Sequence, residues 1–120
     1  MIIDNNFFLD VHSYLKKLAN EIIIPKIGKL KNDEVSTKSD NSKVTSYDVI
    51  IENDLIEYFN NFGFKNIISE EGNSKLIKNS EYLTVDPIDG TRNFINGINK
   101  VAIMISFIKN TQCVFAIIYD

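Results

Sequence analysis

The decapeptide VDPIDGTRNF, residues 85–94, places two aspartates three positions apart around a proline and continues directly into Gly-Thr. A proline restricts the residue before it to extended backbone, so Asp86 is expected at the end of a β-strand. Gly90 permits a tight turn, and Thr91 can cap a helical turn that follows. Asp89 comes round on this turn, and the two carboxylates are therefore predicted to face one space.

The helical turn predicted after Gly90 is suited to bind an anion. The first backbone N–H groups of a helix have no partner within the helix, and they bind phosphate readily. At such a helix start Arg92 alone is unfavourable by about 0.3–1 kcal/mol, because it meets the positive end of the helix dipole. A bound anion would make this arginine favourable, so the segment predicts a phosphate site beside the two carboxylates.

Other acidic residues are expected to complete a metal site. Glu70 follows the β-prone run NIIS, and Asp48 opens a predicted helix. If Glu70, Asp86 and Asp89 converge within about 4–5 Å, each like-charge pair costs roughly 3–4 kcal/mol at an effective dielectric of about 20. Convergence therefore requires a cation, and oxygen ligands with open positions for water and phosphate fit Mg²⁺ best. The combination indicates metal-assisted hydrolysis of a phosphate ester, with the Thr91 hydroxyl orienting the attacking water.

Each of these features also has a simpler interpretation. Asp-Pro and Asp-Gly are common turn formers, Asp48 can merely favour the helix dipole, and residues 70–72 can form a solvated loop. An EF-hand is excluded because neither acidic stretch has ligands at alternate positions with a closing glutamate. The hypothesis of a metal and phosphate site therefore depends on the combination of motifs.

The spacing of apolar residues predicts two helices before the decapeptide. The first is expected to end near Pro25 or Gly28, and its apolar stripe recurs at intervals of three and four. The second is predicted from the capping box of Thr45 and Asp48 to Gly63. The two stripes consist of Phe8, Val11, Leu15, Leu18 and Ile22, and of Ile51, Leu55, Phe59 and Phe62.

The remaining segments predict a sheet. Residues 31–43, KNDEVSTKSDNSK, are typical of a loop or a frayed hairpin. The runs NIIS and EYLTVD are β-prone, and VAIMISFI and CVFAIIY, separated by KNTQ, predict an antiparallel hairpin. The order predicts an α+β fold, a layered structure in which two helices pack on a mainly antiparallel sheet. Because an apolar strand comes last, we expect a partner or further chain to cover one sheet face.

Composition limits the function classes. The 120 residues are 44% hydrophobic and 24% charged with a formal charge of −3, which favours a single soluble domain and argues against nucleic-acid binding. Cys113 is the only cysteine, so no disulfide framework or thiolate metal site is expected, and its apolar surroundings predict burial. Neither a signal peptide nor an apolar run of about 18 residues is visible, and we expect a cytoplasmic protein without membrane contact.

Three motifs resemble those of the inositol monophosphatase family, a group of Mg²⁺-dependent, lithium-sensitive phosphatases. VTSYD is similar to the family's V-T-x-x-D, SEEG to its G-E-E segment, and DPIDGTRNF to its D-P-I/L-D-G-T-x-N-F signature. The motifs have the family's order and intervals, and the resemblance covers nearly all of residues 1–120. It implies a single, incomplete domain: the N-terminal, metal-binding half of an αβαβα sugar-phosphatase sandwich.

The resemblance also implies roles for individual residues. Metal ligation is implied for the side chains of Glu70, Asp86 and Asp89 and for the backbone carbonyl of Ile88. Phosphate binding is implied at Asp89, Gly90, Thr91 and Arg92, with Mg²⁺ as the cofactor. Catalytic roles are implied for Thr91, which helps to activate the water, for Glu70, and for Asp48, an acid near a more weakly held metal. Lys38 resembles the lysine that precedes V-T-x-x-D in the family, and Lys43, which lies nearer to the motif, is the alternative.

Three departures from the family pattern modify these expectations. Ser69 replaces the glycine of G-E-E, and Arg92 stands where inositol monophosphatases usually carry threonine. A basic residue there resembles relatives that act on histidinol phosphate or nucleotide bisphosphates. The W-D-x-A-A-G-like motif of the family's second half has no match in the chain. We therefore expect a truncated or split phosphatase for a small phosphorylated metabolite, weakly active or inactive alone and completed by a C-terminal half or by homo-oligomerisation.

Two other functions remain open at the level of sequence. The chain can be a non-catalytic regulatory fragment that keeps the metal-binding turn and associates through its exposed sheet face. It can also be a domain that binds Mg²⁺ or phosphate without chemistry.

Overall fold

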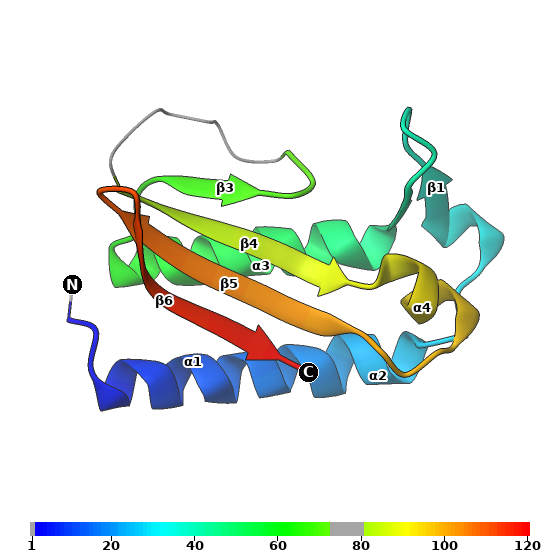
Figure 1. Ribbon diagram of the computed structural model, residues 1–120. Helices are drawn as coiled ribbons and strands as arrows, with labels where there is room; N and C mark the ends of the chain where they lie inside the picture. Colours follow the sequence, from blue (N-terminus) through cyan, green and yellow to red (C-terminus); the bar gives the residue numbers. More distant parts are fainter. Residues whose placement is uncertain (1, 73–80) are drawn as a thin grey trace.

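The computed structural model of the chain describes residues 2–72 and 81–120. Two long helices lie on one face of a four-stranded sheet, and a small ribbon and a short helix lie at one end (Figure 1). Among the described residues, no helix is long and apolar enough to cross a membrane. The predicted α+β layering is confirmed.

The first helix runs through three consecutive segments: α1 (Asn5–Leu18), the π-helical turn η1 (Ala19–Ile23) and α2 (Ile24–Lys26). The backbone N–H of Ile24 donates to the carbonyl oxygen of Ala19, five residues back. Proline lacks an N–H and clashes with the preceding turn of a regular α-helix, and the widened turn lies directly before Pro25. The helix ends at Lys26, as predicted.

One residue of the expected first stripe, Phe8, was wrong, and another, Ile22, is only partly buried against the core. Phe7 is buried where Phe8 was predicted, and Phe8 is 37% exposed. Ile23 is buried where Ile22 was predicted, because the π-helical turn contains one more residue than an α-helical turn and rotates the buried face. The sequence does not reveal this inserted residue.

The second long helix, α3 (Ser46–Phe62), follows the prediction closely. Thr45 is its N-cap and forms the capping box with Asp48, and Gly63 ends the helix at a φ of 109°. Ile51, Leu55 and Phe59 are buried. This helix lies along β4 and brings its first turn to the end of that strand (Figure 1).

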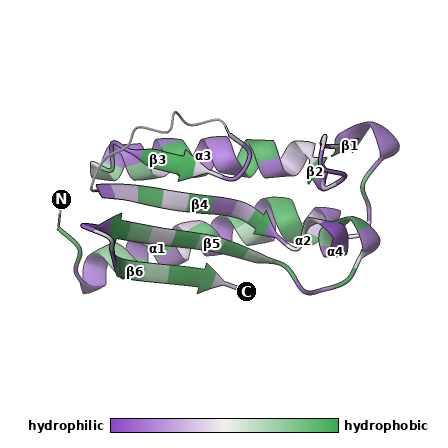
Figure 2. Cartoon of the chain, turned by 45° about the horizontal axis from the view of Figure 1, so that its top comes forward, coloured by the Kyte–Doolittle hydropathy of each residue, from purple (hydrophilic) through white to green (hydrophobic). Residues whose placement is uncertain are grey.

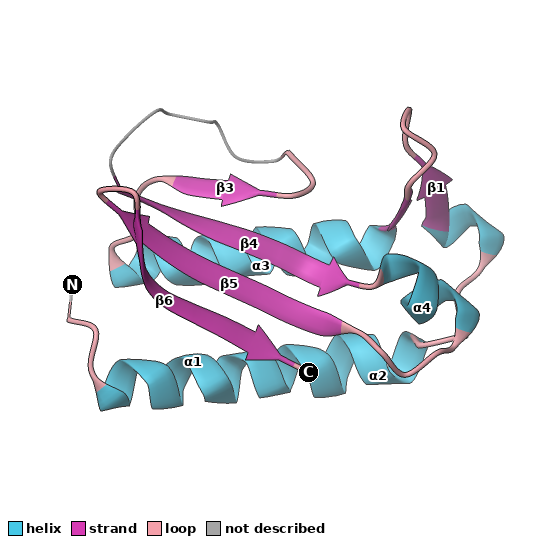
Figure 3. Ribbon diagram, viewed as in Figure 1, coloured by secondary structure: helices cyan, strands magenta, loops and turns pink. Residues whose placement is uncertain are grey.

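The main sheet has the strand order β3 (Ile67–Ser69), β4 (Glu81–Asp89), β5 (Ala102–Lys109) and β6 (Gln112–Tyr119). Strands β3 and β4 are parallel, and the other pairs are antiparallel (Figure 3). Helix α4 (Thr91–Asn96) follows β4 directly. A separate antiparallel ribbon consists of β1 (Val35–Thr37) and β2 (Lys43–Thr45), preceded by the 3₁₀ turn η2 (Asn32–Glu34). Of the loop or frayed hairpin expected at residues 31–43, the structure forms the hairpin.

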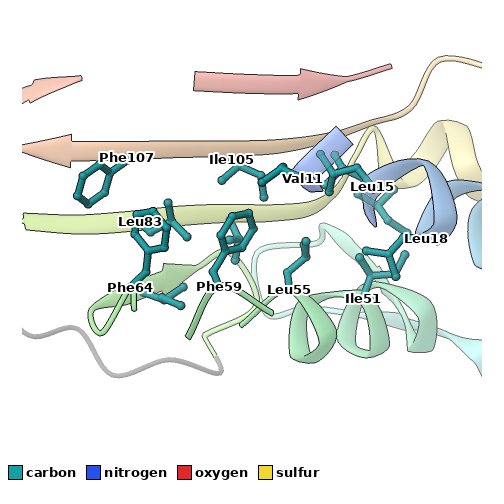
Figure 4. Packing of buried hydrophobic residues seen from close by; sticks show 14 of the residues in the cluster. Val11, Leu15, Leu18, Ile51, Leu55, Phe59, Phe64, Leu83, Ile105 and Phe107 are labelled. Carbon is teal, nitrogen blue, oxygen red and sulfur yellow. The ribbon is translucent and has the colours of Figure 1, made fainter. Parts of the chain in front are cut away.

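The core lies between the helices and the inner face of the sheet (Figure 4). Alternate residues of β4 and β5 point into it, as the two-residue period of a strand requires. Leu83, Ile105 and Phe107 meet Leu55 and Phe59 of α3 in one hydrophobic cluster.

The outer face of the sheet is not covered by any described element. Figure 2 shows that β5 and β6 are largely hydrophobic along their length, and Ile118 of β6 is 65% exposed. Cys113 is exposed, so its predicted burial was wrong. The reason is a register shift in β6: Phe115 pairs with Phe107, but Cys113 pairs with Ile108, so Cys113 lies on the outer face of the sheet.

Candidate functional site

The candidate site lies at the sheet edge where β3 and β4 end and α3 begins (Figure 1). Because β3 and β4 are parallel, their carboxyl ends meet at the same edge. Glu70 directly follows β3, and its backbone N–H donates to the carbonyl oxygen of Val85 at 3.2 Å. Glu70 and Asp86 therefore come from neighbouring strands, and their carboxyl groups lie close enough for Glu70 to raise the pKa of Asp86.

The end of β4 contains an irregularity that redirects the chain. Asp86 pairs with Met104 and Asp89 with Ala102, so β4 has one more residue than β5 over this interval. The extra residue falls at the proline, which cannot donate to the β-ladder. Asp89 is the last residue of β4, directly before the turn, and is exposed.

Gly90 makes the turn possible. Its φ is 86°, and a Cβ built there would lie 2.7 Å from the carbonyl oxygen of Lys100. Both the backbone conformation and the close approach require glycine. Gly90 rather than Thr91 is the N-cap of α4, so the prediction that Thr91 caps this helix was wrong.

The Thr91 hydroxyl contacts Asp48, at the start of α3, instead of capping α4. Its Oγ1 lies 3.0 Å from Asp48 Oδ1 and 3.1 Å from the Ile88 carbonyl oxygen, within donating distance of both. The backbone N–H of Thr45 donates to Asp48 Oδ2 at 2.8 Å. Burial raises the pKa of Asp48, and the hydrogen bonds from Thr45 and Thr91 only partly offset this effect. Thr91 and Asp48 thus join the β4 turn to the start of α3.

Among the acids of the site, Asp86 has the most strongly raised pKa. Burial raises its pKa to about 8, and the hydrogen bond and negative charge of Glu70 add to the shift. The charges of Asp89 and Asp48 act in the same direction. Within the described chain, the buried Oδ1 of Asp86 has no hydrogen-bond partner.

These observations fit a cation. A buried carboxylate oxygen without a donor and several negative charges that disfavour one another are what an oxygen-liganded cation would relieve. Across residues 2–72 and 81–120, however, no three side chains of His, Cys, Asp or Glu lie close enough together to hold a metal ion. The structure places Glu70 and Asp86 together and leaves Asp89 exposed beside them, and the ligand assignment stays a prediction.

The basic residues lie around this edge rather than within it. The Nη2 of Arg92 donates to the Asn41 carbonyl oxygen at 2.9 Å, in the turn between β1 and β2. The Nζ of Lys38 forms an ion pair with Glu71 Oε2 at 3.0 Å. Lys43 Nζ instead donates to Thr37 at 2.6 Å. Among the contacts that the structure describes, Lys38 contacts the G-E-E-like segment and Lys43 does not.

Sequence reasoning missed Glu52. This glutamate of α3 is completely buried, and its Oε1 accepts a hydrogen bond from the Glu71 backbone N–H at 2.8 Å. Its place in the sequence was a usable signal, because a charged residue four positions after Asp48 falls on the buried face of a helix.

Comparison with known proteins shows which family the chain resembles. The model of the inositol monophosphatase family matches residues 4–120. A fructose-1,6-bisphosphatase/inositol-1-monophosphatase from Methanocaldococcus jannaschii is 36% identical over 111 residues, which are 88% of this chain and 43% of that protein. A 3'(2'),5'-bisphosphate nucleotidase from Haemophilus influenzae is 32% identical over 95 residues, 74% of this chain and 35% of that protein.

The fold is also found among solved structures. The Thermotoga maritima IMPase superposes with a TM-score of 0.79 at 26% identity, over 92% of this chain and 42% of that one. The chain therefore spans less than half the length of these relatives. With a family model that matches nearly the whole sequence and a fold that agrees, the chain belongs to the inositol monophosphatase family.

Proposed function

We propose that the chain forms the metal-binding and water-activating side of a phosphatase that hydrolyses a small phosphate monoester with Mg²⁺. The observation that carries the proposal is Asp86, whose buried Oδ1 has no partner in the described chain while Glu70 lies against the same carboxyl group. Hydroxyl and amide groups for water and phosphate lie on the turn that follows.

The metal would be held by the side chains of Glu70, Asp86 and Asp89 and by the Ile88 carbonyl oxygen. All four ligands are oxygen atoms, the type that Mg²⁺ prefers. When bound, Mg²⁺ supplies a Lewis acid for the phosphoryl oxygens and lowers the pKa of a coordinated water.

The side chains behind the turn would orient the attacking water. A threonine hydroxyl that donates to Asp48 keeps its oxygen lone pairs as acceptors, so Thr91 can hold one O–H bond of a water. Burial raises the pKa of Asp48, which makes this carboxylate a stronger proton acceptor than an exposed aspartate. Glu70, adjacent to Asp86, is the second acid that can share in proton transfer.

The phosphate group would bind at the start of α4, against the backbone N–H groups of Gly90 and Thr91 and near Asp89. The left-handed backbone of Gly90 packs directly against the Lys100 carbonyl oxygen, which fixes the shape of the turn that carries these N–H groups. Arg92 and Lys38 would supply positive charge at the rim.

The substrate is proposed only as a class. The named relatives act on sugar bisphosphates, inositol phosphates or bisphosphorylated nucleotides, and these substrates share a phosphate monoester. Because the chain spans less than half of these proteins, we infer that the walls enclosing the rest of the substrate come from further chain or from a second subunit. The 120 residues alone would then turn over substrate slowly or not at all.

The experiment that tests the function is release of inorganic phosphate from inositol-1-phosphate, fructose-1,6-bisphosphate and adenosine bisphosphate, with Mg²⁺ and with chelator. The chain is assayed alone and together with the second half of a family phosphatase. We expect Mg²⁺-dependent release at least in the complemented sample, and its loss in Asp89→Asn. Release that persists in chelator, or that Asp89→Asn leaves unchanged, would contradict the assignment.

A second candidate function is a non-catalytic module that associates through its sheet. The outer face carries a hollow of about 370 Å³ whose lining includes the apolar Ile68, Met104 and Ile118 and, at one end, Glu70 and Asp86 of the candidate site. Light scattering after size-exclusion chromatography tests it, since a monomer at high concentration argues against association through this face.

A further inference from the structure

We propose that Glu52 is a positioning residue of the site: it fixes the turn after β3 in the way that Asp48 fixes the turn after β4. One face of α3 would then set the spacing between the two halves of the site. This inference rests on the proposed function, because the spacing matters to a cation and a phosphate that bind between the turns.

The contacts of Glu52 are unusual for a glutamate. Its side chain is 0% exposed, and Oε1 accepts the Glu71 backbone N–H at 2.8 Å. The other oxygen, Oε2, is buried and has no hydrogen-bond partner in the part of the chain that the structure describes. Burial of a carboxyl group with an unsatisfied oxygen costs free energy. An apolar residue would serve packing alone at lower cost, so the glutamate points to a role beyond packing.

Helix geometry connects Glu52 with Asp48. Residues four positions apart lie on the same face of a helix, separated by a rise of about 6 Å. Asp48 accepts from the Thr91 hydroxyl at 3.0 Å, and Glu52 accepts from the Glu71 backbone. The two turns of the site are thus attached to one rigid element at a spacing that the helix determines.

The segment that Glu52 holds is also connected to the hairpin of β1 and β2. The carboxylate of Glu71, whose backbone is held by Glu52, forms the ion pair with Lys38. Helix α3, the turn after β3 and the loop after β1 are therefore linked in series. The residue before Glu71 is Glu70, so a shift of this segment would move a predicted ligand away from Asp86.

The test compares four variants of the 120-residue chain with the unsubstituted chain. Glu52→Gln keeps an oxygen that can accept from the Glu71 N–H, whereas Glu52→Met keeps the size and removes the acceptor. Glu52→Asp keeps the charge and withdraws it by one methylene. Glu57→Met makes the same chemical change as Glu52→Met at an exposed position of the same helix.

Two measurements are made on folded samples. The first is the affinity for Mn²⁺, followed by the electron paramagnetic resonance signal of the free ion. The second is the hydrogen-exchange rate of the Glu71 amide without metal, followed by NMR. Removal of a residue that supports a metal ligand typically weakens metal binding by about 10- to 100-fold.

We expect Glu52→Met and Glu52→Asp to weaken Mn²⁺ binding by about 10-fold or more and to accelerate exchange at Glu71. Glu52→Gln and Glu57→Met should match the unsubstituted chain in both measurements. If Glu52→Met does not fold, Glu52→Asp decides the outcome.

Unchanged Mn²⁺ affinity in Glu52→Met and Glu52→Asp would overturn the inference while leaving the proposed function intact. The same applies if Glu52→Gln loses as much affinity as Glu52→Met, because the acceptor would then not be what matters. Absence of Mn²⁺ binding by the unsubstituted chain would overturn the proposed function and, with it, the positioning role of Glu52.

Discussion

The two turns that build the candidate site are stabilised in different ways. The end of β4 and the turn that follows it, residues 86–91, carry their own geometry, because a proline interrupts the ladder and Gly90 adopts a left-handed backbone. The turn after β3, residues 70–72, depends on distant segments, through Glu52 on α3 and Lys38 before β2. One turn is specified locally, and the other requires that α3 and the hairpin are already packed.

This difference explains why the first turn was predictable and the second was not. A residue with restricted backbone acts on its immediate neighbours, so its effect can be inferred from sequence. A hydrogen bond between residues 19 positions apart, as between Glu52 and Glu71, depends on how a helix lies against a strand. The comparison can be tested by substitutions in each turn.

The largest loss of stability is expected for Gly90→Ala. A Cβ there would lie 2.7 Å from the Lys100 carbonyl oxygen, on backbone that residues with side chains rarely adopt. Strain and clash together should lower the free energy of unfolding by about 3 kcal/mol, measured by urea denaturation.

The matched control is Gly72→Ala, in the turn after β3. Its φ of 75° is similarly left-handed, but no atom of residues 2–72 and 81–120 lies within 4 Å of the position that a Cβ would take. Its loss should be only about 1 kcal/mol, the cost of the backbone conformation alone. Equal losses at the two glycines would remove the distinction between the turns.

An intermediate loss is expected for Thr91→Val, which keeps the shape of the side chain and removes the hydroxyl. Asp48 Oδ1 would lose the donor that lies 3.0 Å away, inside a buried region. An unsatisfied buried polar group costs about 1–3 kcal/mol, which urea denaturation can measure.

The conservative variant Thr91→Ser restores the hydroxyl and should recover most of this stability. A valine variant as stable as the unsubstituted chain would show that the contact between Thr91 and Asp48 does not hold the β4 turn against α3.

The smallest effect is expected for the ion pair of Lys38 and Glu71. Its side chains are 30% and 8% exposed, so solvent still screens the lysine. A double-mutant cycle with Lys38→Met and Glu71→Gln should give a coupling free energy of about 0.5–1 kcal/mol at low salt, falling as salt is added. A coupling near zero would leave Glu52 as the main support of the turn after β3.

Several elements could be predicted because their signals are local. The capping box of Thr45 and Asp48 and the closing Gly63 define α3, and both are present as expected. The π-helical turn was not predictable, because no residue of Ala19–Ile23 indicates that an N–H will donate to the carbonyl oxygen five residues back. As a result of this turn, Ile23 rather than Ile22 is fully buried.

The candidate site also combines features that could be predicted from sequence with contacts that could not. The alternation of strands and turns predicts that acidic residues lie at the ends of β3 and β4. It also predicts that these residues lie close together at one edge of the sheet. The partner of Arg92 could not, because the arginine reaches the Asn41 carbonyl oxygen in a hairpin 51 positions earlier. Cys113 was misplaced for a related reason, since an apolar neighbourhood in sequence does not say which face of an edge strand is covered.

By itself the sequence determined the α+β fold, the ends of α3, the tight turn at Gly90 and the motifs that assign the family. These features depend on backbone restrictions and short-range periodicity, and both are determined by residues that are close in sequence. Only the tertiary structure decided that Glu52 holds the Glu71 backbone, that Thr91 faces Asp48, and that Lys38 rather than Lys43 pairs with Glu71. Such contacts join segments that become neighbours only when helix, hairpin and sheet pack on one core, because packing alone brings them within hydrogen-bond distance.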